Sequence, residues 1–205
     1  MGREAICTAT YNGETSEGKA HLDTDALIFR GGFRLSVPYK EVECAQAMDG
    51  KLSLRFRGQS ALLELGSEAA PWAERILNPP SLMKKLGVKP GLTAAIMGPI
   101  ESEFVRDIER EGVGVLVDSA PVDLVFLQSD EPAELVRTQE AARRISPEGA
   151  VWVITPRGRP ELRDIEVMAA GKAVGLVDVK VCRFSDTHTA LKFVIPKADR
   201  HKSRE

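Results

Sequence analysis

The stretch that decides the fold of the longer part of the chain is Val122-Asp123-Leu124-Val125-Phe126-Leu127, an apolar run broken by a single carboxylate. Consecutive apolar residues are typical of a strand buried on both faces, as in a parallel sheet. A similar run precedes it at 93–97, and another follows at 150–154. Helical spacing of apolar residues separates the three runs. This alternation of strand and helix predicts a mainly parallel sheet covered on both faces.

The remaining elements of this part are predicted from the same periodicities. One helix carries Phe104, Val105 and Ile108 on its inner face and ends at Gly112, because a helix commonly closes on a left-handed glycine. A strand over 113–117 follows. Two further helices are expected, one beginning at Pro132 and one ending near 171–175. Their predicted inner faces are Leu135, Val136, Ala142 and Ile145 in the first, and Leu162, Ile165, Met168 and Ala169 in the second.

Two strands end this part, over 177–183 and 190–195. Too few residues join them for a helical crossover, so we expect an antiparallel hairpin at one edge of the sheet. The joining loop, 184–189, contains His188 flanked by Asp186, Thr187 and Thr189. A catalytic dyad or a metal site could be imagined there. A turn held by Asp and Thr hydrogen bonds explains the same residues and is favoured.

The first part of the chain has the period-2 alternation of half-buried strands, clearest where Leu52, Leu54 and Phe56 alternate with polar residues. Asp49-Gly50 is the best turn signal, because a tight hairpin needs positive φ. Seven strands are expected, at about 4–11, 18–23, 26–30, 33–38, 41–47, 51–57 and 60–65. The loop over 12–18, with Glu14 and Glu17, joins the first two.

A helix over 68–77 follows the strands, with Ser67 as its predicted N-cap. Its inner face comprises Ala69, Trp72, Ala73 and Ile76, and Trp72 is expected to fill one end of the strand layer. Asn78-Pro79-Pro80 ends the helix and makes a stiff joint. The predicted domains are therefore 1–78 and 81–196, followed by a polar basic tail, 197–205.

Seven strands and one C-terminal helix, with the phrases 20–29, 37–42 and 70–76, resemble the pleckstrin-homology-like superfold and its GRAM-like branch. The resemblance implies a β barrel closed by the helix. Such domains often bind phosphoinositides through basic residues of the first loop. Here that loop has two carboxylates and no base before Lys19, so phosphoinositide binding is not expected there.

The second part resembles class I methyltransferases, through the parallel sheet with its antiparallel hairpin and the phrases 122–127 and 146–153. The resemblance implies a Rossmann-like domain. S-adenosylmethionine binding needs a glycine-rich turn after the first strand, whereas the turn at 97–101 has one glycine, a proline and an early carboxylate. No cofactor is therefore expected. A closer resemblance, through 85–91, 149–153, 175–181 and 189–194, is to a bacterial domain family of unknown function, which implies a fold and no activity.

The composition of the chain limits the classes of molecule that it is expected to bind. A net charge of −2 and an aromatic content of 5% give little attraction for phosphate backbones or base stacking, so nucleic acid is not expected. A basic face on the first part would be an exception, comprising Arg30, Arg34, Lys51, Arg55 and Arg57. Outward positions of half-buried strands explain these residues better.

The cysteines Cys7, Cys44 and Cys182 lack ligand spacing, and no second histidine pairs with His188, so no metal site is predicted. No apolar run could span a membrane, and a reducing cytoplasm is expected.

Two functions compete. The leading hypothesis is a non-catalytic protein-interaction or scaffold protein, because neither predicted domain carries a complete catalytic motif. A homo-oligomer is one form that such a protein could take. The alternative is a small-ligand or nucleotide binder, or a methyltransferase-like enzyme, that uses the C-terminal edge of the α/β sheet. Its candidate residues are Gly98, Asp118, Arg157 and Arg159.

Overall fold

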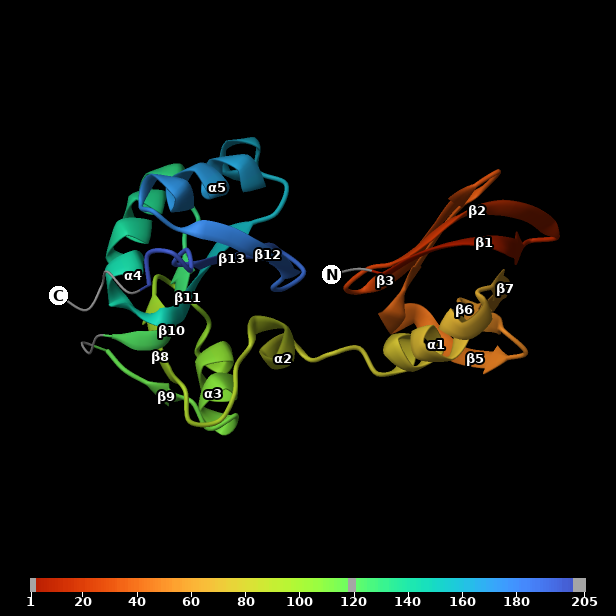
Figure 1. The fold of residues 1–205 in the computed structure, drawn as a ribbon, viewed down its shortest axis with the longest axis horizontal. Coiled ribbons are helices and arrows are strands. Elements are labelled where there is room, and N and C mark those ends of the chain that lie inside the picture. Colours follow the sequence, from red (N-terminus) through yellow and green to blue (C-terminus); the bar gives the residue numbers. More distant parts are fainter. Residues whose placement is uncertain (1–2, 118–120, 201–205) are drawn as a thin grey trace. The chain divides into compact units, whose positions relative to one another are not determined.

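The structure is a computed structural model that describes residues 3–117 and 121–200. The chain divides into two compact units, residues 1–80 and 81–205 (Figure 1). Each unit builds its own sheet and its own hydrophobic core. Within the described residues, no helix is long and apolar enough to cross a membrane.

The first unit is a curled, seven-stranded antiparallel sheet in the order β4-β3-β2-β1-β7-β6-β5. Its strands are β1 (Arg3–Tyr11), β2 (Glu14–Leu22), β3 (Ala26–Gly31), β4 (Arg34–Pro38), β5 (Val42–Met48), β6 (Lys51–Phe56) and β7 (Gln59–Glu64). A short 3₁₀ turn, η1 (Tyr39–Glu41), joins β4 to β5. The seven predicted strands are all present, with small shifts at their ends.

The expected loop over 12–18 is wrong. Asn12 and Gly13 both have positive φ, 51° and 81°, which is the geometry of a two-residue hairpin turn. Strand β2 therefore begins at Glu14, and Glu17 lies opposite Thr8 within the ladder. The two carboxylates therefore belong to a strand, and only the two-residue turn Asn12-Gly13 joins β1 to β2.

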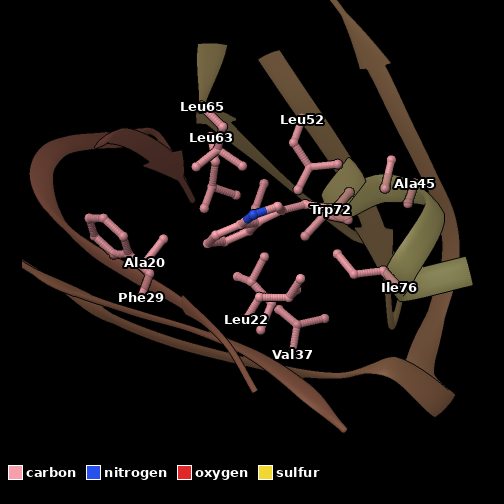
Figure 2. Packing of buried hydrophobic residues seen from close by; sticks show 14 of the residues in the cluster. Ala20, Leu22, Phe29, Val37, Ala45, Leu52, Leu63, Leu65, Trp72 and Ile76 are labelled. Carbon is pink, nitrogen blue, oxygen red and sulfur yellow. The ribbon is translucent and has the colours of Figure 1, made fainter. Parts of the chain in front are cut away.

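The sheet of the first unit closes around one indole ring. Helix α1 (Ala69–Leu77) packs against β5 and β6, and its Trp72 is fully buried among Leu22, Leu52 and Leu63 (Figure 2). The predicted inner face of this helix is confirmed, since all four residues are buried. Its predicted start is wrong, because Ser67 lies in a 3₁₀ turn, η2 (Gly66–Glu68), and caps nothing. The Trp72 Nε1–H instead donates to the Glu68 carboxylate at 3.0 Å.

The second unit is an α/β domain with a mainly parallel sheet. Its six-stranded sheet has the order β12-β13-β11-β10-β8-β9. The strands are β8 (Thr93–Met97), β9 (Gly114–Val115), β10 (Val122–Gln128), β11 (Ile145–Pro156), β12 (Val177–Arg183) and β13 (His188–Val194). Strands β9, β8, β10 and β11 run parallel, whereas β13 lies antiparallel between β11 and β12. The predicted parallel sheet and terminal hairpin are both present.

Helices cover both faces of this sheet. They are α2 (Leu82–Leu86), α3 (Ser102–Arg110), α4 (Thr138–Arg144) and α5 (Asp164–Ala173). The core on one face includes Phe104 and Ile108 of α3 with Trp152 of β11. The opposite core includes Ala141 of α4 and Val167 of α5 with Phe193 of β13. Helix α5 lies so close to β13 that a Cβ on Gly171 would come within 2.2 Å of the Phe193 ring.

Three sequence predictions fail in this unit. Strand β9 has two residues rather than the five of 113–117. The segments beginning at Pro132 and Pro160 start as 3₁₀ turns, η3 (Pro132–Arg137) and η4 (Pro160–Leu162), before their α-helices. A 3₁₀ turn advances three residues per turn rather than 3.6, so it rotates the apolar face predicted from helical spacing. Val136 and Ile165 are therefore 73% and 66% exposed, and Ile145 begins β11 instead of ending the helix.

Replacing Trp72 by alanine tests the core of the first unit. We expect the Trp72→Ala variant to lose about 3–5 kcal/mol of unfolding free energy in this unit, the usual cost of a large cavity. Leu77→Ala, half-exposed on the same helix, is the control and should cost less than about 1 kcal/mol. Urea unfolding followed by ¹H–¹⁵N NMR measures both, with the amides of the second unit as an internal reference. Equal losses in the two variants would contradict the packing described here.

Candidate functional site

The carboxyl ends of the parallel strands form one edge of the second sheet. Strands β8, β10 and β11 end there at Met97, Gln128 and Pro156. Because β13 runs antiparallel to β11, it begins where β11 ends, and His188 lies directly opposite Pro156. Open α/β sheets bind their ligands at this edge, outside the carboxyl ends of the strands.

A chain of polar side chains crosses this edge. The Gln128 Nε2 amide donates to both carboxylate oxygens of Asp130, at 3.1 and 3.0 Å. Asp130 Oδ1 also lies 3.2 Å from His188 Nε2, and Thr187 Oγ1 lies 2.8 Å from His188 Nδ1. Residues about sixty positions apart in the sequence thus form a hydroxyl–imidazole–carboxylate series.

Each ring nitrogen of His188 has a side-chain neighbour. If Nε2 carries the proton, it donates to Asp130 and leaves Nδ1 to accept from the Thr187 hydroxyl. In this tautomer Nε2 does not also accept from the Gln128 amide, 3.4 Å away, which donates to Asp130 alone. The Asp130 carboxylate would then hold the imidazole in one orientation and stabilise it when protonated, as the carboxylate of a catalytic triad does. The His188 side chain is 22% exposed, so it is shielded and still reachable from solvent.

Backbone hydrogen bonds fix both loops that carry the series. On the β10 side, Ser129 N donates to Ile154 O at 2.9 Å, and Asp130 N donates to the Glu134 carboxylate at 2.7 Å. On the β13 side, Arg157 N donates to Thr187 O at 2.8 Å. The Ser129 hydroxyl beside this edge is fully buried and has no hydrogen-bond partner among the described residues. The side chains are therefore held by the sheet rather than by a free loop.

A groove of about 650 Å³ lies at the same edge, between the end of β11 and the start of α5. Its lining includes Thr155 and Thr189, which are paired across β11 and β13. Side chains alternate between the faces of a strand, so Thr189 lies on the opposite face from His188. The groove and the His188 series therefore lie next to each other on the two sides of one sheet edge.

The structure brings together two of the four predicted site residues. Arg157 and Arg159 both line the groove. Gly98 is not among its lining residues, and Asp118 lies outside the described residues. Arg159 pairs with Glu131 at 3.2 Å, which links the groove to the segment after β10.

The turn after β8 does not fit an adenosyl group. Gly98 has a φ of +93°, and a Cβ added to it would lie 2.5 Å from the backbone oxygen of Gln128. Its lack of a side chain is therefore required by β10. Pro99 has no N–H, and the Ile100 N–H donates to Gly98 O at 3.0 Å. Neither Pro99 nor Ile100 therefore offers a free backbone amide to a ligand at this turn.

His188 was expected in a loop and lies instead in the first position of β13. Ser185, rather than the predicted Asp and Thr side chains, holds the adjacent turn, since its Oγ accepts from both Thr187 N and His188 N. Asp130 and Gln128, the partners of His188, were not singled out from the sequence. Their position directly after a doubly buried strand was the available signal, because such residues lie at the ligand-binding edge.

A second group of cations lies on the α2 face of the same sheet. Lys192 Nζ is 5.8 Å from the centre of the Trp152 ring. Burial lowers the pKa of Lys192, and the positive charges of Lys180 and Lys89 lower it further. Lys180 Nζ donates to Lys85 O at 2.6 Å, which ties the hairpin to α2. No described hollow includes Lys192, so this group is explained by packing.

The remaining sequence candidates do not form sites among residues 3–117 and 121–200. Of the basic face considered above, Lys51 and Arg55 pair with the strand carboxylates Glu64 and Glu43, at 2.8 and 3.2 Å, and Arg57 pairs with Glu41 of η1 at 2.6 Å. The three cysteines form no disulfide within the described residues, and burial raises the pKa of the Cys7 thiol. No cluster of three potential metal ligands occurs in this described part of the chain.

No protein-family model matches the sequence, and no curated protein matches it. The chain is similar in structure to an S-adenosylmethionine-dependent O-methyltransferase from Thermotoga maritima, with 9% identity, 94% of each chain covered and a TM-score of 0.45. It is also similar to an S-adenosylmethionine-dependent methyltransferase from Aquifex aeolicus, with 17% identity, 56% of this chain and 88% of that chain covered, and a TM-score of 0.38.

These neighbours correct the leading functional hypothesis. A non-catalytic scaffold is contradicted, because structures that share the outline are methyltransferases. Their similarity is too low to carry over a ligand or a residue role. What this chain binds must therefore be argued from its own residues.

A glycine-to-alanine pair tests the closed turn after β8. Alanine at either Gly98 or Gly158 must adopt a positive φ, which costs about 1–2 kcal/mol. Only at Gly98 would the new Cβ also meet a backbone oxygen, since nothing lies within 4 Å of a Cβ at Gly158. We expect Gly98→Ala to destabilise the second unit more than twice as much as Gly158→Ala in urea unfolding. Equal destabilisation would show that the turn is open.

Proposed function

We propose that the second unit is an enzyme domain that binds a small organic molecule at the carboxyl edge of its sheet. His188 would act there as the general base, oriented by Asp130. The observation that carries the proposal is the Thr187–His188–Asp130 series, in which each ring nitrogen has a partner of the type that acid–base catalysis requires. This proposal follows the second hypothesis of the sequence analysis, a small-ligand binder or methyltransferase-like enzyme, and it rests on His188 and Asp130.

The proposed step is a proton transfer from a substrate hydroxyl. The Thr187 hydroxyl occupies His188 Nδ1 in the structure, at 2.8 Å. A substrate hydroxyl that takes its place gives its proton to Nδ1: the O–H bond breaks, an N–H bond forms, and the oxygen keeps the electron pair. The imidazolium that results is stabilised by the Asp130 carboxylate.

The first unit is proposed to be a pleckstrin-homology-like domain, with domain boundaries at 1–78 and 81–196. Its antiparallel strand order and the helix that packs on β5 and β6 support this assignment. Its own hollow, of about 280 Å³, is lined by residues that include Arg3 and Arg75. Arg3 is already paired with Glu68, and no series like that of His188 is found beside this hollow. The chemistry is therefore assigned to the second unit.

An NMR titration of the intact ¹⁵N-labelled chain tests the proposed function. Phenol supplies a hydroxyl, and anisole is the same ring with that hydroxyl methylated. We expect phenol to shift the amides of 128–131 and 187–190. We also expect His188→Gln and Asp130→Asn to weaken phenol binding by about two- to tenfold, the worth of one net hydrogen bond, while anisole binding stays unchanged.

The matched control is His21→Gln, which removes a histidine from β2 in the first unit. It should leave both affinities as they are. The proposal is overturned if phenol shifts only the amides around Arg3 and Arg75, if it binds nowhere, or if His188→Gln weakens phenol and anisole equally.

A further inference from the structure

The groove beside the His188 series has an apolar floor. Leu162 is buried beneath it, and Ile165 stands two-thirds exposed on its wall, together with Pro156 and Pro160. The Ile165 side chain thus adds apolar surface to the wall of the groove. At about 650 Å³ the groove has the size of small-molecule sites. Its walls therefore suit a compact apolar body, such as a single aromatic ring.

One guanidinium at the rim of this groove is without a partner. Arg159 pairs with Glu131 and Glu161, at 3.2 and 3.7 Å, and Arg163 pairs with Glu166 at 2.5 Å. The Arg157 side chain makes no hydrogen bond or ion pair with any other described residue. Its backbone is nevertheless fixed, because Arg157 N donates to Thr187 O at 2.8 Å. The groove thus has one guanidinium that no other described residue pairs with, at a fixed place in the backbone, and its lining also includes the carboxylate of Asp164.

Two hydroxyls lie in the same groove and are equally free. Thr155 and Thr189 face each other across β11 and β13, and neither side chain is hydrogen bonded to another described residue. Thr155 is only 2% exposed. Both hydroxyls can therefore donate to a ligand oxygen in the groove. This observation is independent of the arginine and points to the same ligand class.

We infer that the groove binds an anionic oxygen group carried on a small apolar body. The anion would pair with the Arg157 guanidinium, whose planar fork suits carboxylate and phosphate oxygens. The Thr155 and Thr189 hydroxyls would donate to the same group, and the apolar part would cover Leu162 and Ile165. The inference rests on the proposed function, because it gives the chemical class of the molecule bound at that edge.

Binding of phenyl phosphate, benzoate and benzyl alcohol to the intact chain tests this inference. Phenyl phosphate and benzoate separate the two sources of the anion, a phosphate ester and a carboxylic acid, and benzyl alcohol is the neutral control. We expect at least one anion to bind with shifts at 155–165, and at least about tenfold more tightly than benzyl alcohol. The tighter of the two anions identifies the source.

Arg157→Gln should weaken that anion by at least about tenfold and leave benzyl alcohol unchanged. The matched control is Arg143→Gln, which removes another exposed arginine from the same unit, beside a different hollow. Thr189→Val should weaken the anion without a change in fold, which isolates the hydroxyl.

The inference is overturned if neither anion binds, if benzyl alcohol binds as tightly, or if Arg157→Gln and Arg143→Gln have the same effect. Failure here is distinguishable from failure of the proposed function. Phenol shifts at 128–131 and 187–190 that depend on His188 would survive the loss of the anion site.

Discussion

The antiparallel pairing of β13 with β11 is the constraint on which the rest of the second unit depends. A parallel strand in that place would begin at the opposite edge and carry His188 away from the carboxyl ends of β10 and β11. The antiparallel ladder, with His188 opposite Pro156, instead brings an imidazole to the residues that follow β10. The same ladder sets Thr189 beside Thr155, and so builds both the acid–base series and the groove.

The chain departs from a nucleotide-binding sheet at the turn after β8, where backbone packing decides the geometry. Gly98 lies against the carbonyl of Gln128, Pro99 has no amide, and Ile100 uses its amide within the turn. The hydroxyl–imidazole–carboxylate series of Thr187, His188 and Asp130 lies at the same edge, on residues of β13 and of the segments that flank β10 and β13.

Local sequence signals predicted the elements well, and contacts between distant residues poorly. Period-2 alternation predicted the seven strands of the first unit, and helical spacing predicted the buried face around Trp72. Helical spacing predicted the wrong buried face at Val136 and Ile165, because the segments that contain them begin with a proline and a 3₁₀ turn. Arg157 and Arg159 were identifiable because strand ends mark a ligand edge. The contact of Asp130 with His188 was not, since it depends on strand order, which periodicity does not encode.

A double-mutant cycle between Asp130 and His188 tests the central claim most directly. If the two side chains are in contact, the unfolding free energies of Asp130→Asn and His188→Gln will not add in the double variant. The account predicts a coupling of at least about 0.5 kcal/mol, the usual lower bound for residues in contact. Additive effects would contradict it, because they would show that β13 does not bring His188 to the carboxylate after β10.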